Sequence, residues 1–234
     1  MKKLIDVLRR SSAMESPWHQ VFEYEVGDER DTVATALREI NLRDALVDVD
    51  GRVAKPICWE CSCLQKKCGA CAMVVEGVPR LACDARLSGF RHQTIHLEPL
   101  RKFPVVADLK VDRARMFENL KEARVWLEGE SELREKRRDI AYEASRCLQC
   151  GCCLEVCPNF NPRDAFGGMS TMVPLARLLS EASPEQRAQL KEAYREKVYG
   201  GCGKSLACRN ICPAEIDIDK LLSRSNAAAV WGRF

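Results

Sequence analysis

The chain has 234 residues, of which 46% are hydrophobic and 30% charged, with a formal net charge of +3. This composition is ordinary for a folded protein with a core of its own, and the length allows one large or two modest domains. The small net charge, without a dominant basic tract, gives no indication of nucleic-acid binding.

The sequence contains no segment typical of a signal peptide or a membrane-spanning helix. The basic start, Met1-Lys2-Lys3, is not followed by an apolar run, and no stretch approaches the roughly 18 apolar residues of a span. We therefore expect a cytoplasmic protein whose contact with a membrane comes through a partner. The 14 cysteines favour metal ligation over a disulfide framework, because reducing compartments keep thiols free.

The first hundred residues predict a small domain that is rich in β-strands. Asp31 or Thr32 is the predicted N-cap of its one helix, and Glu76-Gly77 is the predicted turn of a hairpin. We assign residues 1–104 to this domain, because the order of its elements suits a β-grasp ferredoxin. The predicted elements are strands over 3–7, 20–26 and 94–97, a helix over 32–41 and a hairpin over 72–80.

The second half of the chain, residues 105–234, predicts an all-helical domain, so the fold class is α+β. An apolar, extended segment over 100–111 is interpreted as the linker between the two domains. Ser183-Pro184-Glu185-Gln186 has the form of a capping box with proline at the first helical position. The predicted helices cover 113–127, 132–146 and 184 to about 198, the last ending at Gly200-Gly201.

Eleven of the 14 cysteines fall into three spaced sets that indicate iron–sulfur clusters. The first set has the plant-type spacing of a [2Fe–2S] ferredoxin. Starting the pattern at Cys58 would place Lys66 at a ligand position, so only the start at Cys63 completes it. The sets are Cys63-x4-Cys68-x2-Cys71-x11-Cys83, Cys147-x2-Cys150-x2-Cys153-x3-Cys157-Pro158 and Cys202-x5-Cys208-x3-Cys212-Pro213.

The second and third sets complete each other when each gives its last cysteine to the other cluster. Two-cluster ferredoxins use this exchange for the run C-x2-C-x2-C-x3-C-P. The predicted ligands of a [4Fe–4S] cluster are then Cys147, Cys150, Cys153 and Cys212. The other cluster keeps Cys157, Cys202 and Cys208, and its middle position is Ser205. Three thiolates predict a [3Fe–4S] cluster, and the alternative is a fourth iron bound by the Ser205 alkoxide.

Three cysteines remain outside the sets. Cys152 is interpreted as a small packing thiol. Cys58 and Cys61 are interpreted as spare thiols beside the first cluster loop, with a redox C-x-x-C dithiol as the alternative.

The remaining polar residues predict no catalytic site. No Ser/His/Asp arrangement, phosphate loop or paired-carboxylate site emerges from the sequence. The chain is therefore predicted to conduct electrons and to make no bonds itself. The three histidines are interpreted as ordinary surface or core residues; they are His19, His92 and His96.

Five segments carry a resemblance to a known family. The chain resembles the iron–sulfur subunit of succinate dehydrogenase and fumarate reductase over nearly all of its length, with the motifs in the same order. The segments are Cys63-Leu-Gln-Lys-Lys-Cys-Gly-Ala-Cys-Ala-Met, Leu81-Ala-Cys, Pro104-Val-Val-Ala-Asp-Leu, Arg146-Cys-Leu-Gln-Cys-Gly-Cys-Cys and the run from Cys202 to Pro213.

The resemblance implies a relay of [2Fe–2S], [4Fe–4S] and [3Fe–4S] clusters. Electrons would pass between an FAD-containing partner subunit, where succinate and fumarate interconvert, and a quinone at a membrane-anchor subunit. The chain would then lie on the cytoplasmic side of the cell membrane as a peripheral subunit, and haem b on the anchor is left open. Two alternatives stay open: the same relay in a soluble or differently anchored flavoprotein reductase with another acceptor, and a zinc-binding structural module.

The sequence departs from familiar members in three places. Lys66 and Lys67 stand where glycine and an apolar residue are frequent, and these cations are expected to raise the potential of the first cluster. The alternative is a solvated rim or a docking contact. Asn159, Phe160 and their neighbours replace a tryptophan that helps to bind quinone, and Gly203 replaces a histidine. We therefore expect the anchor to supply the quinone contacts, or the electron exit to differ.

Overall fold

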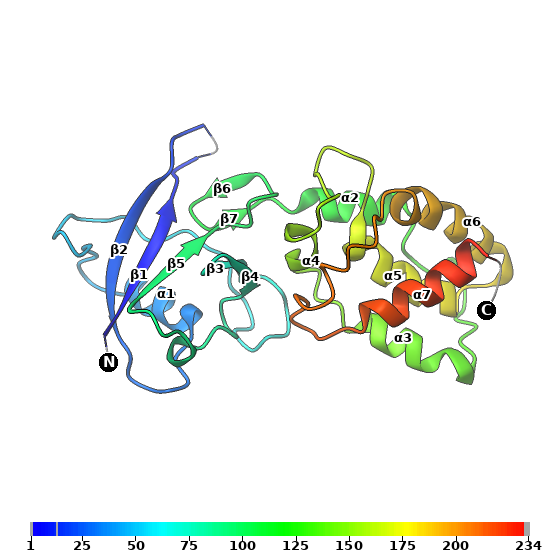
Figure 1. Cartoon of the computed structure of the whole chain (residues 1–234), viewed down its shortest axis with the longest axis horizontal. Coiled ribbons are helices and arrows are strands. Elements are labelled where there is room, and N and C mark those ends of the chain that lie inside the picture. Colours follow the sequence, from blue (N-terminus) through cyan, green and yellow to red (C-terminus); the bar gives the residue numbers. More distant parts are fainter. Residues whose placement is uncertain (1, 13, 232–234) are drawn as a thin grey trace. The chain divides into compact units, whose positions relative to one another are not determined.

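The computed structural model describes residues 2–12 and 14–231 (Figure 1). The chain divides into two compact units, Met1–Asp112 and Arg113–Phe234, and each is described separately.

The first unit is built on a five-stranded sheet with the order β2-β1-β5-β3-β4 (Figure 1). β1 pairs antiparallel with β2 and parallel with β5, and β3 pairs antiparallel with both β4 and β5. This sheet confirms the predicted ferredoxin-like β domain. The strands are β1 (Lys2–Arg9), β2 (Trp18–Glu25), β3 (Ala72–Val75), β4 (Val78–Leu81) and β5 (Thr94–Glu98).

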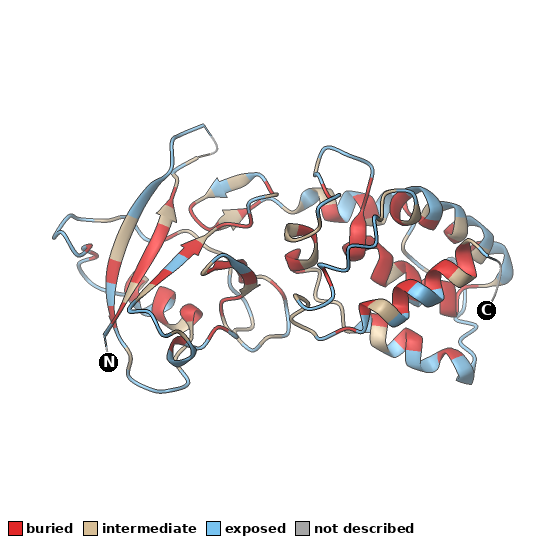
Figure 2. Ribbon diagram, in the orientation of Figure 1, coloured by how far each residue is buried: buried red, intermediate tan, exposed pale blue. Residues whose placement is uncertain are grey.

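One helix, α1 (Val33–Asn41), completes the core of the first unit. The Thr32 hydroxyl accepts a hydrogen bond from the Thr35 N–H, and the Thr35 hydroxyl accepts one from the Thr32 N–H. These reciprocal bonds form a capping box at the start of the helix. The helix buries Leu37 and Ile40, which are fully enclosed with Ile5 and other sheet residues. Figure 2 shows the buried residues along the inner strands and this helix. A single-turn 3-10 helix, Leu87–Gly89, follows the hairpin of β3 and β4.

The segment predicted as an extended linker instead forms a small hairpin of β6 (Val105–Ala107) and β7 (Lys110–Val111). Asp108 makes the turn with φ +44° and is buried. Its carboxylate accepts hydrogen bonds from Arg9 Nε at 2.9 Å and from the Cys58 backbone N–H at 2.8 Å. The prediction was wrong here because these contacts join residues far apart in the sequence, which a local pattern does not reveal.

The second unit is helical, as predicted (Figure 1). Its central helix, α5, packs against α3, α4, α6 and α7. Leu175, Leu179 and Leu221 are among the fully buried residues of this core. The elements are α2 (Ala114–Glu122), a 3-10 turn (Glu135–Arg137), α3 (Arg138–Ser145), α4 (Cys152–Glu155), α5 (Gly168–Glu181), α6 (Pro184–Tyr194), a π-helical turn (Arg195–Tyr199) and α7 (Ile218–Ala229).

The helices of the second unit differ from the sequence prediction in two respects. The predicted helices over 113–127 and 132–146 are shorter, and the first ends before Arg124, whose φ is +52°. Helices α5 and α7 were not predicted from the sequence. Helix α5 is buried on nearly all sides and contains Pro174, so it lacks the polar stripe by which helical periodicity is recognised. Ser183 caps α6 as predicted, by accepting a bond from the Gln186 N–H.

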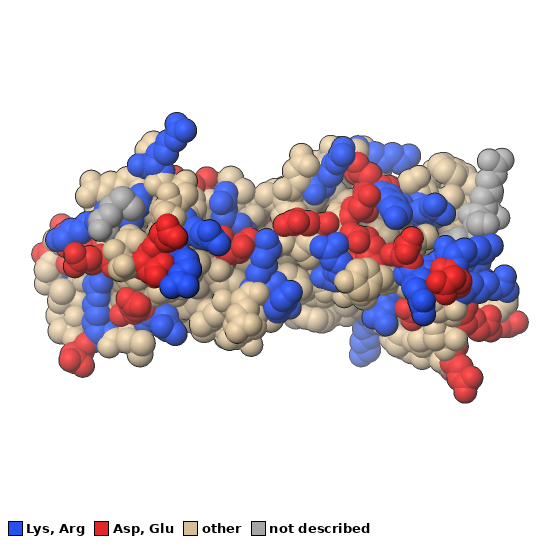
Figure 3. All heavy atoms as spheres, turned by 90° about the horizontal axis from the view of Figure 1, so that it is seen from below, with Lys and Arg blue, Asp and Glu red and all other residues tan. Residues whose placement is uncertain are grey.

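No helix among residues 2–12 and 14–231 is long and apolar enough to cross a membrane. On the face shown in Figure 3, Lys and Arg side chains are interspersed with Asp and Glu.

Candidate iron–sulfur cluster sites

The first cysteine set lies on an irregular loop that precedes β3 and at the end of the hairpin of β3 and β4. Cys71 is buried directly before β3, and its carbonyl accepts a bond from the Ala82 N–H at 3.0 Å. The hairpin therefore places Cys71 beside Cys83. Its turn, Glu76-Gly77, has positive φ at both residues, as expected for a tight two-residue connection.

The loop directs backbone N–H groups at the predicted ligand sulfurs. Gln65 and Lys67 donate to Cys63 Sγ at 3.4 Å each, and Lys66 donates to Cys83 Sγ at 3.3 Å. Three positions, Leu64, Lys66 and Gly69, have φ between 53° and 75°, which turns the chain around the sulfurs. Hydrogen bonds to thiolate sulfur stabilise negative charge there.

The electrostatic neighbours of these cysteines show which thiols lie together. The Gln65 and Lys67 N–H groups and the neighbouring Cys68 thiol lower the pKa of Cys63 to about 7. Burial, with Cys83 and Cys68 nearby, raises the pKa of Cys71 to about 12. Cys68 therefore lies near both Cys63 and Cys71, and Cys83 lies beside Cys71. A buried thiol of such high pKa becomes a thiolate at neutral pH when a metal binds it, so this donor set fits a cluster.

The two spare thiols upstream differ in position. The carbonyl of Cys58 accepts a bond from the Leu109 N–H at 3.0 Å, which joins it to the hairpin of β6 and β7. Cys61 is exposed, and both are free thiols.

The second site brings together four cysteines from segments far apart in the sequence. Cys147, Cys150, Cys153 and Cys212 line one small cavity. Its wall is mostly apolar and includes Met169 and Val173 from α5, Ile216 and Ile218. Gln149 and Gly151, with φ of 50° and 89°, turn the chain between these cysteines and into α4. Burial raises the pKa of Cys147 to about 11, which again fits a donor set that is completed by metal.

Contacts from α3 hold the segment that carries Cys212. Arg146, at the end of α3, donates to the Ala214 carbonyl and is paired with Glu143 at 3.1 Å. Glu143 also accepts a bond from the Asp217 backbone N–H at 2.9 Å. These bonds fix the position of Cys212 relative to the turn that contains Cys147.

The third site contains the remaining set. Cys157 follows α4, and Cys202 follows the π-helical turn, where its N–H bonds to the Val198 carbonyl at 3.0 Å. Burial raises the pKa of Cys208 to about 11, and the neighbouring Cys157 and Cys202 act in the same direction. These three thiols are therefore neighbours, while Ser205 is exposed on the loop between Cys202 and Cys208.

Cys152 is fully buried in α4, in agreement with its interpretation as a packing thiol. Among the described residues, no group of three or more His, Cys, Asp or Glu side chains converges on a single ion. In a polynuclear cluster each iron takes only one or two protein thiolates.

The histidines lie apart from the cysteine sets. His19 and His96 are half-exposed, and each ring Nδ1 contacts the buried Asp6 carboxylate, at 3.0 and 2.7 Å. The carbonyl of His92 accepts a bond from Lys3 Nζ. These contacts agree with the interpretation of the histidines as ordinary structural residues.

Two sequence profiles match the two halves of the chain. The "2Fe-2S iron-sulfur cluster binding domain" family covers residues 4–118, and the "4Fe-4S dicluster domain" family covers residues 143–216. The succinate dehydrogenase iron-sulfur subunit of Bacillus subtilis is 36% identical over 230 residues, which span 94% of this chain and 89% of that protein. The chain belongs to the iron–sulfur subunit family of succinate dehydrogenase and fumarate reductase.

Further comparisons agree with this family. The fumarate reductase iron-sulfur subunit of Escherichia coli O157:H7 is 28% identical over 228 residues, covering 93% of this chain and 89% of that protein. A chain of the Mycobacterium smegmatis Sdh1 complex has the same fold, with a TM-score of 0.74, 21% identity and coverage of 97% and 96%. As a member of the family the chain is an electron-transfer subunit with [2Fe–2S] and [4Fe–4S] cluster-binding domains.

Proposed function

We propose that the chain relays electrons between an FAD-containing subunit, which interconverts succinate and fumarate, and a quinone at a membrane-anchor subunit. The observation that carries this proposal is the cavity lined by Cys147, Cys150, Cys153 and Cys212. In this cavity the fourth cysteine, Cys212, comes from the last cysteine motif. Cys157, the last cysteine of the second motif, is therefore assigned to the other cluster. This exchange is the arrangement of a two-cluster relay.

The proposed ligand sets are those indicated by spacing and supported by the neighbouring thiols. When bound, the clusters supply one-electron transfer. The sets are Cys63, Cys68, Cys71 and Cys83 for [2Fe–2S], Cys147, Cys150, Cys153 and Cys212 for [4Fe–4S], and Cys157, Cys202 and Cys208 for [3Fe–4S].

The chain's own residues give each set a different environment. The first lies beside loop N–H groups, with Cys68 exposed, so its sulfurs are partly in contact with water. The second is enclosed by apolar residues of α5 and of the segment after Pro213. Burial and hydrogen bonding are two of the means by which a protein sets cluster potentials. The three sets are therefore expected to have different potentials.

The chain would be a peripheral subunit on the cytoplasmic side of the membrane, held by the anchor. Haem b, where present, belongs to that anchor. The relatives that support these partners are the iron–sulfur subunits of succinate dehydrogenase and fumarate reductase.

One contact favours a second candidate, the same relay with another electron acceptor. Asn159 Nδ2 donates to the Gly201 carbonyl at 2.6 Å. A Cβ at Gly203 would meet this same amide at 3.1 Å. The two departures from familiar members are thus in contact, and together they reshape the surface beside Cys157 and Cys202. A quinone site built by this chain would need different side chains there.

The test is purification of the intact complex from its source. We expect iron and labile sulfide in the amounts that the three clusters require, together with flavin and dicarboxylate-dependent reduction of a quinone. Zinc in place of iron and sulfide would show a structural module. Dicarboxylate activity without quinone reduction would favour the second candidate.

A further inference from the structure

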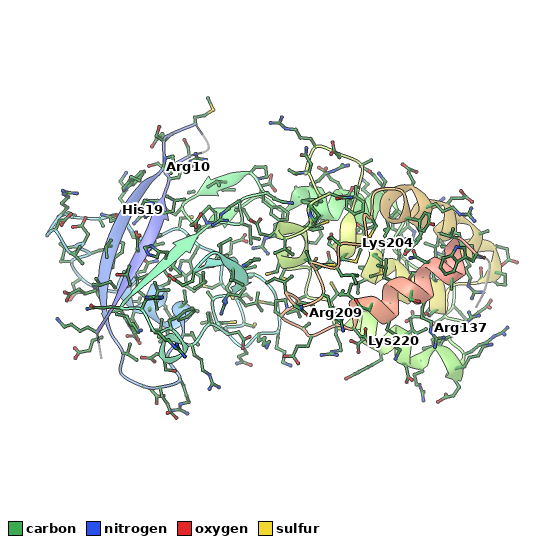
Figure 4. All side chains as sticks on the ribbon, in the orientation of Figure 1. Arg10, His19, Arg137, Lys204, Arg209 and Lys220 are labelled. Atoms are coloured by element: carbon green, nitrogen blue, oxygen red, sulfur yellow. The ribbon has the colours of Figure 1, made fainter. Side chains whose placement is uncertain are left out.

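A cavity of about 540 Å³ opens in the first unit, between the end of β1, the start of β2 and the hairpin of β6 and β7. Its volume is within the range of small-molecule sites, roughly 300–1,000 Å³. The residues that carry the argument are Arg9, Arg10, Trp18, Lys55 and Asp108, and none of them is a proposed cluster ligand. Figure 4 labels Arg10 at the end of β1.

The acidic group of the cavity is already neutralised. Asp108 is, among the described residues, the one acidic side chain that lines it. Its carboxylate is paired with Arg9, and both side chains are about 5% exposed. It also accepts bonds from the backbone N–H groups of Arg10 and Cys58. The remaining guanidinium nitrogens of Arg9 donate to Gln20 and to backbone carbonyls. The ion pair of Arg9 and Asp108 is therefore electrically neutral, and its hydrogen-bonding groups are already occupied.

Two other cations line the cavity, Arg10 and Lys55. Arg10 Nε is buried and has no hydrogen-bond partner, and no described carboxylate pairs with the side chain of Arg10 or of Lys55. An arginine stays charged at every physiological pH, and buried polar atoms normally have partners. The cavity thus holds an excess positive charge and a guanidinium with a buried, unused donor at Nε. A guanidinium offers its donors as a planar fork, which matches carboxylate and phosphate oxygens.

An aromatic ring stands beside these cations. Trp18 is opposite Arg9 in the register of β1 and β2, lines the cavity and is 42% exposed. Indole rings favour flat partners by stacking and add apolar area at low entropic cost. We propose that this cavity is a binding site for an anionic ligand that bears a phosphate or carboxylate group on a flat, aromatic carrier.

The ligand would bind with its anion on Arg10 and Lys55 and its ring on Trp18. Two kinds of molecule carry an anionic group next to an aromatic ring in this way. One is a free small molecule such as a nucleotide, and the other is an acidic, aromatic segment of a partner protein. The site goes beyond the electron relay, and its occupancy does not depend on the ligands assigned to the clusters.

The test is isothermal titration calorimetry on the full chain with its clusters at low ionic strength. The probes are pyrophosphate, ADP, adenosine and a synthetic acidic peptide with an aromatic residue. We expect ADP or the peptide to bind, adenosine to bind at least tenfold more weakly than ADP, and added NaCl to weaken binding. Binding of ADP or pyrophosphate assigns a small-molecule source, and binding of the peptide alone assigns a protein segment.

The variants separate the two parts of the site. Arg10→Gln is expected to reduce affinity at least tenfold, and Lys55→Gln several-fold. Trp18→Phe should weaken ADP more than pyrophosphate. Arg52→Gln is the matched control, because Arg52 is exposed, pairs with Asp50 at 3.4 Å and does not line the cavity. Circular dichroism and cluster absorbance show that each variant is folded. Absence of binding by every probe, or equal affinity in wild type and Arg10→Gln, overturns the proposal.

Discussion

The side-chain amide of Gln149 donates a hydrogen bond to Cys147 Sγ, with 3.2 Å between Nε2 and the sulfur. The same nitrogen donates to the Ser170 carbonyl of α5 at 3.0 Å, which holds the amide in place. Gln149 is in the left-handed region, with φ of 50°, within the turn that separates Cys147 from Cys150. A donor fixed on a ligand sulfur stabilises the more negative, reduced cluster.

We expect Gln149→Leu to lower the midpoint potential of the [4Fe–4S] cluster by about 30 to 60 mV, up to a tenfold change in a one-electron equilibrium. Gln149→Glu should lower it further, because a carboxylate repels the thiolate. Potentiometric titration monitored by electron paramagnetic resonance measures both. Gln189→Leu is the control, since Gln189 accepts a hydrogen bond from Arg124 and bonds to none of the described cysteines. An unchanged midpoint in both Gln149 variants would show that this bond does not tune the cluster.

The predicted effect of Lys66 on the first cluster depends on its ion pair with Asp84, which local sequence does not reveal. Lys66 Nζ is 2.8 Å from Asp84 Oδ2, while the Lys66 N–H donates to Cys83 Sγ. Much of the ammonium charge is therefore balanced beside the cluster. We expect Lys66→Gln to lower the [2Fe–2S] midpoint and Asp84→Asn to raise it, each by about 20 to 60 mV.

Lys67 is exposed, so Lys67→Gln should change this midpoint less than Lys66→Gln. The same potentiometric titration gives all three values. Shifts of the same sign for Lys66→Gln and Asp84→Asn would contradict the charge argument.

On the proposed ligand sets, Ser205 is expected to decide the composition of the third cluster. It is exposed on a loop in which Lys204 and Leu206 have φ of 55° and 57°. With three thiolates, the oxidised wild type should show the paramagnetic signal of [3Fe–4S]. Ser205→Cys should diminish that signal by allowing a fourth iron, and Ser205→Ala should leave it intact. A silent oxidised wild type would indicate that the Ser205 alkoxide or another ligand completes a cubane.

The start of α5 depends on Gly168 having no side chain. Its φ is +58°, and an added Cβ would lie 2.6 Å from Leu154 Cδ2 in α4. We expect Gly168→Ala to destabilise the chain by about 1–3 kcal/mol, through backbone strain and overpacking. This corresponds to a fall in Tm of roughly 2–12 °C by far-UV circular dichroism. Gly129→Ala is the control, because a Cβ there meets nothing within 4 Å. Equal Tm values for the two variants would refute the argument.

Local patterns were sufficient to predict much of the fold. The strands of the first unit, α1 with its Thr32 cap, the Glu76-Gly77 hairpin and the helical second half follow from periodicity and turn chemistry, which act over a few residues. The three cysteine sets were equally visible, because cluster ligation imposes fixed spacings on neighbouring ligands. The ligand assignments themselves remain predictions, which the neighbouring thiols support.

The sequence by itself thus determined the family, the kind of chemistry and the candidate ligands. Tertiary structure decided the rest: the buried α5, the hairpin that contains Asp108, the pairing of Lys66 with Asp84 and the unpartnered Nε of Arg10. The physical reason is the same in each case. Burial and ion pairing depend on which distant segments meet, and neither spacing nor periodicity encodes those meetings in one stretch of chain.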